Sequence, residues 1–297
     1  MTEMRDIVCI GSVLWDIIGR TPAPMRFGAD MPGRISRLPG GVAMNIAMTL
    51  TRFGMRPILL SAVGRDSQGV ELLAQAGRLG IYAGHVYRSA DLPTDRYMAI
   101  ECATGLVAAL ADAHSLEAAG DKILQPLADG RLGSADAPWH GPVALDGNLT
   151  TDLLAQIARS PLFARADLRV APASPGKAER LLPLLAHPRV TFYVNLEEAS
   201  ILCQSQFGSA REAAEGLARR GARRALVTDG GRDAADMSAE GVLTACPPEV
   251  LVSRVTGAGD TFMAAHLVAE YAGCPREEAL SRALLAAARY VSGDIAT

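Results

Sequence analysis

Short apolar runs alternate with longer amphipathic segments along the whole chain. The runs are rich in Val, Ile and Leu, as in buried parallel strands, and cover residues 6–13, 56–64, 142–148, 168–174, 190–195 and 223–230. Between them, apolar residues recur at helical spacing, for example in residues 43–54, 69–80, 178–187 and 211–221. This alternation predicts an α/β fold with a doubly wound, mostly parallel central sheet and helices on both faces.

Two regions interrupt this alternation. Residues 14–39 and about 92–113 contain turn residues typical of β-hairpins and the alternating pattern of β-strands. Neither region has a segment of helical periodicity. We interpret them as excursions of a single domain, residues 1–297, that form a small second β-sheet, a lid over the strand ends. Ligands of open α/β sheets bind beyond the carboxyl ends of the strands, where a lid would exclude water.

Composition narrows the class of protein. The chain has 297 residues, of which 49% are hydrophobic and 21% charged, so it can bury a large core. Its net charge of -3 argues against a nucleic-acid partner, and no stretch approaches the length of a membrane span. The five cysteines are scattered without a C-x-x-C motif, which argues against disulfides or thiolate zinc. We therefore expect a cytoplasmic protein without a membrane or nucleic-acid partner.

Residues 254–273, RVTGAGDTFMAAHLVAEYAG, are the strongest candidate for chemistry. A glycine-rich turn leads into apolar residues at helical spacing from Thr261 onward. A helix N-terminus offers free N–H groups and the positive end of the helix dipole, and glycines allow the backbone to approach a ligand closely. Asp260 is therefore either an ordinary helix N-cap or the base of an anion site beside the amides of residues 257–259.

Other short motifs also fall where a predicted strand ends and a helix begins. Gly40 and Gly41 followed by Asn45 could be a plain turn and helix cap, and Asn195 to Glu198 could be an acidic first helical turn. Because all of these motifs lie along one edge of the predicted sheet, a shared ligand site explains them better than coincidence. Neither the G-x-x-x-x-G-K-[ST] motif nor G-x-G-x-x-G is present, which argues against a Walker-type NTPase and a Rossmann dehydrogenase.

Several motifs occur together in an order typical of one known family. They are GSVLWD near the start, GGVAMNIA at 40–47, LSAVGRDSQG at 60–69, N-x-x-E at 195–198 and VTGAGDTF at 255–262. Through them the chain resembles the ribokinase (PfkB) family of carbohydrate and nucleoside kinases over essentially its whole length. Within the family it is most similar to pseudouridine kinases, through MPGRISRLPGGVAMNIA and LDGNLT at 145–150. The resemblance implies a ribokinase-like fold and ATP-dependent phosphorylation of a primary hydroxyl group on a ribose-containing substrate.

The resemblance gives the helix start a catalytic role that the physics also allows. Asp260 would be the general base that takes the proton from the substrate hydroxymethyl group. The amides of Gly257, Ala258 and Gly259 would hold the transferring phosphoryl group at the helix N-terminus. The glycines would then expose the amides, with the carboxylate directly beside them.

The resemblance also implies the sites for metal, nucleotide and substrate. Asn195 and Glu198 would organise Mg²⁺, partly through water, because this ion keeps much of its hydration. Thr228 and Gly230 would lie along ATP. The substrate-binding residues implied are Asp16, Gly40, Gly41, Asn45 and Asn148.

Among the departures of the sequence from the family pattern, those at Leu14 and Arg254 bear directly on the substrate and cation sites. Leu14 stands where the family usually has a sugar-binding amide, so the site loses a hydrogen bond worth about 0.5–1.5 kcal/mol. We expect Leu14, Trp15, Thr94 and Tyr97 to contact a nucleobase instead. Arg254 stands where many relatives have an acidic residue that helps to bind a monovalent cation, so we expect no such cation site.

Alternative functions and the assembly state follow from the same residues. A simple sugar kinase acting on a ribose- or fructose-like substrate is the first alternative, and a non-catalytic ligand-binding pseudokinase is the second.

The apolar lid runs YMAIECA and GLVAALA would be costly to leave in water, so we expect two lids to pack together in a homodimer.

Overall fold

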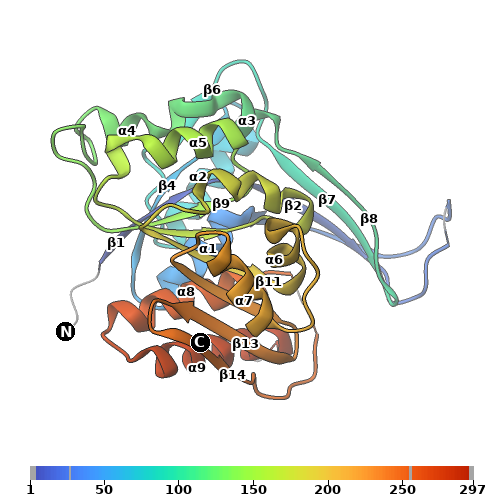
Figure 1. Ribbon diagram of the computed structural model, residues 1–297. Coiled ribbons are helices and arrows are strands. Elements are labelled where there is room, and N and C mark those ends of the chain that lie inside the picture. The colour runs from blue at the N-terminus through green and yellow to red at the C-terminus, as the bar shows by residue number, and fades with distance from the viewer. Residues whose placement is uncertain (1–4, 27, 254–255, 294–297) are drawn as a thin grey trace.

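The computed structural model describes residues 5–26, 28–253 and 256–293 (Figure 1). Within these ranges an eight-stranded sheet forms the centre, in the order β14-β13-β12-β11-β10-β9-β1-β4. The strands β12, β11, β10, β9, β1 and β4 are parallel to one another. At the other end of the order, β13 pairs antiparallel with β12, and β14 pairs antiparallel with β13. The strands are β1 Asp6–Ile10, β4 Arg56–Leu60, β9 Pro142–Asp146, β10 Asp167–Ala171, β11 Val190–Asn195, β12 Arg224–Asp229, β13 Arg232–Ser238 and β14 Gly241–Ala245. The predicted α/β class is confirmed.

Helices cover both faces of this sheet (Figure 1). They are α1 Val42–Arg52, α2 Ser67–Arg78, α3 His114–Ala119, α4 Gln125–Ala128, α5 Thr151–Arg159, α6 Leu196–Cys203, α7 Ala210–Arg219, α8 Ala258–Tyr271 and α9 Arg276–Ser292, with 3₁₀ segments η1 Gly120–Leu124, η2 Pro161–Phe163 and η3 Pro175–Leu184. The prediction of an ordinary α-helix over residues 178–187 was wrong. Pro183 lies inside η3 and has no N–H to donate, which disfavours the α-helical hydrogen-bond pattern.

Two hydrophobic cores lie on opposite faces of the central sheet. Successive side chains of a strand point to opposite faces, so Val8 of β1 packs in the core with α3, α5 and α7, and Cys9 packs in the core with α1, α8 and α9. The doubly buried strands explain the continuous apolar runs of the sequence. Among the residues that the structure describes, no helix is both long and apolar enough to cross a bilayer.

A second, four-stranded sheet projects from the central body (Figure 1). Its strands, in spatial order, are β3 Arg34–Gly40, β2 Leu14–Arg20, β7 Arg96–Cys102 and β8 Gly105–Asp112. All four come from the two regions that interrupt the alternating pattern. A short parallel pair, β5 Ala62–Gly64 with β6 Tyr87–Ser89, lies where the chain leaves the body for β7.

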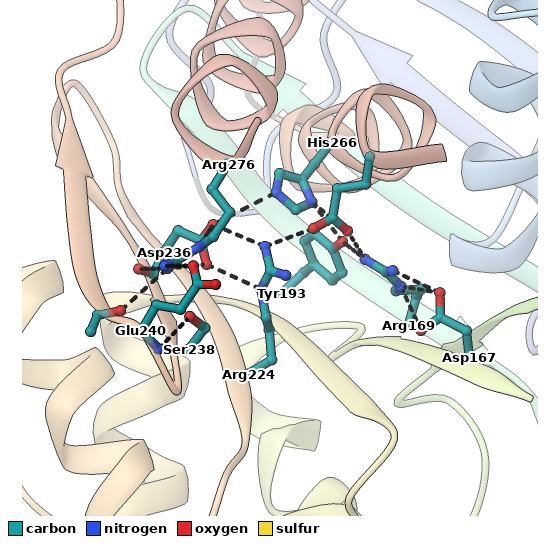
Figure 2. A network of polar contacts seen from close by, with 11 residues as sticks. Asp167, Arg169, Tyr193, Arg224, Asp236, Ser238, Glu240, His266 and Arg276 are labelled. Carbon is teal, nitrogen blue, oxygen red and sulfur yellow. Dashed lines mark hydrogen bonds and ion pairs between the residues drawn. The ribbon is translucent and has the colours of Figure 1, made fainter. Parts of the chain in front are cut away.

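A buried polar network fixes α8 against the sheet (Figure 2). Arg169 on β10 and Arg224 on β12 both form ion pairs with Glu270 on α8. Arg169 also donates to the Tyr193 hydroxyl (3.0 Å), which is hydrogen-bonded to Nδ1 of His266 (2.9 Å). Burial lowers the pKa of His266 to about 3, so the ring is neutral within this network. The helix that carries Asp260 is therefore held from several strands at once.

Candidate active site

A cleft of about 1380 Å³ opens at the carboxyl ends of the parallel strands. Its walls come from the ends of β10, β11 and β12, the start of α8, and Tyr97 of the small sheet. The predicted site residues that line it are Asn45, Asn195, Glu198, Thr228, Gly230, Gly257, Ala258, Gly259 and Asp260. Segments more than 200 residues apart in sequence thus meet at one edge of the sheet, where ligands of open α/β folds bind.

The start of α8 combines exposed amides with a carboxylate. Gly257 is the N-cap, with a left-handed φ of 90°, and its carbonyl accepts hydrogen bonds from the amide (3.0 Å) and hydroxyl (2.9 Å) of Thr261. The helix begins at Ala258, so Asp260 lies in its first turn and is not the N-cap, which was one of the two alternatives for this residue. Gly259 is exposed, and a Cβ atom added to it would meet no atom of the surrounding structure within 4 Å. This end of α8 can receive an anion.

Asp260 lies among other carboxylates. Burial raises its pKa from the ordinary 3.8 to about 7, and the negative charges of Asp146, Glu198 and Asp16 add to the effect. A hydrogen bond with the Asn45 side chain opposes the shift. A carboxyl group with a pKa near neutrality is well matched to accept a proton at physiological pH.

The raised pKa makes a stability prediction that does not depend on activity. The folded chain binds more protons at Asp260 than the unfolded chain does between pH 4 and 7, so this group destabilises the fold as pH rises through that window. Asp260→Asn removes the titration. We expect the melting temperature of the variant, relative to the natural chain, to increase from pH 4 to pH 7 and then level off. A difference that is constant with pH would contradict the raised pKa.

Asn195 and Glu198 form a capping box at the start of α6. The Asn195 side chain accepts from the Glu198 amide (2.9 Å), and a Glu198 carboxylate oxygen accepts from the Asn195 amide (2.8 Å). Burial raises the pKa of Glu198 to about 7. The second carboxylate oxygen of Glu198 lies outside the box, and the described residues contain no cluster of three potential metal-ligating side chains. This donor set suits a Mg²⁺ ion that keeps most of its water ligands.

The double glycine makes room for the Asp16 side chain and for the backbone of Ser12. A Cβ atom on Gly40 would lie 2.0 Å from Oδ2 of Asp16, and one on Gly41, which has φ of 91°, would lie 2.5 Å from the Ser12 carbonyl oxygen. Burial raises the pKa of Asp16 to about 6. Asp16 is paired with Tyr97 across β2 and β7, so both side chains project from the same face of the small sheet.

Asp146, which the motif reading missed, organises the floor beside the cleft. Its buried carboxylate accepts hydrogen bonds from the amides of Ser12 (2.7 Å), Ala43 (3.0 Å) and Asn148 (2.7 Å). The Asn148 side chain donates to the Ser12 hydroxyl (2.8 Å) and accepts from Lys177. Asn148 therefore lies in this cluster with protein partners on both polar atoms, and its contact with substrate stays a prediction. The only sequence signal for Asp146 was its place two residues before Asn148.

Two of the expected nucleobase contacts are engaged within the protein. The fully buried Trp15 donates its indole N–H to the Gln68 carbonyl (3.0 Å), and the hydroxyl of buried Thr94 donates to Asp66 (2.6 Å). The expectation that these side chains contact a base was therefore wrong. Tyr97 does line the cleft, and Leu14 is almost fully buried on the Asp16 side of β2.

Comparisons with known proteins agree with this architecture. The family model described as "pfkB family carbohydrate kinase" matches residues 4–293. The pseudouridine kinase of Escherichia coli (strain K12) is 29% identical over 281 residues, which cover 89% of this chain and 83% of that protein. A carbohydrate kinase from Agrobacterium tumefaciens superposes with a TM-score of 0.82 at 26% identity, covering 99% of this chain and 93% of the other. A ribokinase from Thermotoga maritima shares the fold, with a TM-score of 0.76 at 22% identity and coverage of 97% and 93%.

The family match spans almost the entire chain and includes every motif that lines the cleft. These kinases phosphorylate small sugar or nucleoside substrates with ATP, and the carboxylate beside open helix amides is suited to that transfer. The chain belongs to the pfkB family of carbohydrate kinases and is an ATP-dependent phosphotransferase.

Proposed function

We propose that the protein transfers the γ-phosphoryl group of ATP to the primary hydroxyl of a ribose-containing nucleoside, with pseudouridine as the substrate to test first. The observation that carries the proposal is the position of Asp260 beside the open amides at the start of α8, inside the cleft. The identity to the pseudouridine kinase of Escherichia coli supports the choice of nucleoside.

In the proposed reaction, Asp260 accepts the proton of the substrate hydroxyl as its oxygen attacks the γ-phosphorus and ADP leaves. The amides of residues 257–259 stabilise the negative charge on the transferring phosphoryl group. Asn45 holds the Asp260 carboxylate by a hydrogen bond. Thr228 and Gly230 lie along the cleft wall for ATP. Mg²⁺, organised through water by Asn195 and Glu198, supplies charge neutralisation on the phosphates when bound.

The lid side of the cleft supports a nucleoside over a free sugar. Tyr97 adds an aromatic ring at the cleft wall, whereas Asp16, on the same face of the small sheet, and the buried Leu14 are not among the described residues that line the cleft. In the proposed complex Asp16 offers a carboxylate to the ribose hydroxyls, and Leu14 replaces an amide by an alkyl group. A free sugar cannot use the aromatic and apolar contacts, whereas a base can.

A substrate panel tests this choice. We expect pseudouridine to show the highest kcat/KM among pseudouridine, uridine, adenosine, ribose and fructose, and Leu14→Asn to shift the preference toward ribose. If ribose or fructose is the best substrate of the natural chain, the simple sugar kinase takes the place of the nucleoside kinase. If no member of the panel is phosphorylated at any ATP concentration, the non-catalytic alternative is supported instead.

We propose that the activity does not depend on a monovalent cation. The predicted loss of the monovalent-cation site rests on Arg254, which lies outside the described residues. We expect the rate of phosphorylation to change by less than about twofold when potassium is replaced by a large inert cation at constant ionic strength. Strong activation by potassium would contradict this expectation.

All five cysteines are free thiols, which supports a reducing cytoplasm as the compartment.

We also propose that two lids pack together in a homodimer. Ile35, Met98, Ile100 and Leu110 project from one face of the small sheet, and Ile35 and Leu110 are 80% and 71% exposed. Exposed apolar side chains gathered on one sheet face mark an interface. We expect a dimer in light scattering at micromolar concentration and a monomer for Leu110→Lys. Val70→Lys, which changes an exposed side chain of α2, should stay dimeric; a monomeric natural chain would contradict the proposal.

A further inference from the structure

A second cavity, of about 420 Å³, lies apart from the cleft and shares no lining residue with it. We call it the basic pocket and define it by Arg65, His85, Tyr87, Arg88, Lys122 and Arg131. No acidic side chain lies among the described residues that line it. The proposed reaction uses none of these residues, so the concentration of basic side chains needs another explanation.

The positive charges of the basic pocket are only partly neutralised. Arg131 forms a bidentate ion pair with Asp129, at 2.6 to 3.0 Å, and is thereby compensated. Burial, followed by the charge of Arg131, lowers the pKa of His85, so its ring is neutral at physiological pH. Arg65, Arg88 and Lys122 have no carboxylate within 4.0 Å in the part of the chain that the structure describes.

The hydrogen bonds and the ring contact that the described residues give to the three uncompensated cations come from neutral groups. The Arg88 guanidinium donates to the Gly64 carbonyl through Nε (3.2 Å) and Nη2 (2.9 Å), and Arg65 donates through Nε to the Arg88 carbonyl (3.3 Å). The Lys122 ammonium lies 5.5 Å from the centre of the Tyr87 ring. Like charges held around one concavity repel one another, and an anion placed between them would relieve that repulsion.

We propose that the basic pocket binds a phosphate-type oxyanion, as a mono- or diphosphate. Guanidinium groups present paired donors that match phosphate oxygens, and an ammonium group adds a mobile positive charge. The cavity volume falls within the range of small-molecule sites. The ligand would contact Arg65 and Arg88 on one wall and Lys122 on the other.

The two walls of the basic pocket lead to the two ends of the lid hairpin β7–β8. Arg88 lies on β6, and the chain passes from there to β7; Lys122 lies in η1, which follows β8 and α3 (Figure 1). The Asp95 carboxylate already links these connections by accepting from the amides of Ser115 (2.8 Å) and Leu116 (3.0 Å). A bound anion would tie the two ends of the hairpin together further. Tyr97 of β7 lines the cleft, so, given the proposed function, anion binding would change the KM of the nucleoside.

Binding is tested without any activity measurement. Pyrophosphate, inorganic phosphate and uridine 5′-monophosphate are titrated by calorimetry into the natural chain, the double variant Arg65→Gln/Lys122→Gln and the control Arg223→Gln. Arg65, Lys122 and Arg223 are exposed, so these variants should fold. We expect at least about a tenfold loss of affinity for one binding event in the double variant only, and Lys122→Arg to retain it. The ligand that binds most tightly identifies the source of the phosphate group.

The place of binding is tested with tungstate, an oxyanion with the shape of phosphate that gives a strong anomalous signal. In soaked crystals we expect a peak between Arg65 and Lys122. A peak only at the start of α8, or isotherms that are the same for the double variant and the natural chain, would overturn the proposal. Neither result would affect the kinase assignment, because the basic pocket and the cleft have separate lining residues.

Discussion

Asp260→Asn should lower the turnover number by about 10²–10⁴-fold and leave ATP affinity almost unchanged. The substitution keeps the size of the side chain and removes its ability to accept a proton. Because the proton moves only as the phosphoryl group is transferred, the loss appears in kcat more than in binding. Steady-state kinetics with pseudouridine, together with a direct titration of ATP, measure both quantities.

The raised pKa adds a second signature to the same variant. Asp260 must be ionised to act as a base, and its pKa is about 7 in the free protein. The kcat/KM of the natural chain should therefore rise with pH up to about 7 and then level off, and the variant should lose this dependence. Asp152→Asn is a matched control, because Asp152 also lies in the first turn of a helix, α5, but is exposed. A near-normal rate for Asp260→Asn would exclude its role as the base.

Gly40→Ala should lower kcat/KM by about 10²-fold, the next largest effect that we expect. The added methyl carbon would lie 2.0 Å from Oδ2 of Asp16, a separation that no packed structure tolerates. Gly40 is buried at the end of β3, so the Asp16 carboxylate must move instead. A shift of about 1 Å in a positioning group can cost a factor of this size. The loss should lie mainly in the KM of the nucleoside, with that of ATP little affected.

Gly77→Ala is the matched control for this substitution. Gly77 lies on an exposed face of α2, and an added Cβ would meet no atom within 4 Å. Alanine in a helix is favoured over glycine by about 0.5–1 kcal/mol, so the control should be slightly more stable and fully active. Equal activities of Gly40→Ala and the natural chain would show that Asp16 does not hold the substrate.

The sheet was predictable because its strands are buried on both faces. Apolar runs such as residues 190–195 carry that signal in the sequence itself, and the structure places β11 at the same residues. The antiparallel strands β13 and β14 lacked it, since RDAADMS and GVLTA contain few large apolar residues. The 3₁₀ segment η3 was misread because its apolar spacing is helical, although Pro183 removes a backbone donor.

The position of residues 257–260 in the cleft was predictable because a glycine-rich motif marks the start of a helix there. What could not be predicted were contacts between distant segments. Asp146 binds the amides of Ser12 and Ala43 only because β1 and β9 lie side by side. The engagement of Thr94 by Asp66 likewise depends on tertiary packing, and nothing in either local sequence indicates it.

The most direct test of the account is to identify the product. The protein is incubated with ATP, Mg²⁺ and pseudouridine, and the products are followed by ³¹P NMR with proton coupling. We expect a single new phosphate monoester resonance, split by the two protons on the 5′ carbon, and its formation to fall by about 10²–10⁴-fold with Asp260→Asn. A phosphate on a ring hydroxyl, or ATP consumed to free phosphate with the nucleoside unchanged, would contradict the proposed transfer to the primary hydroxyl.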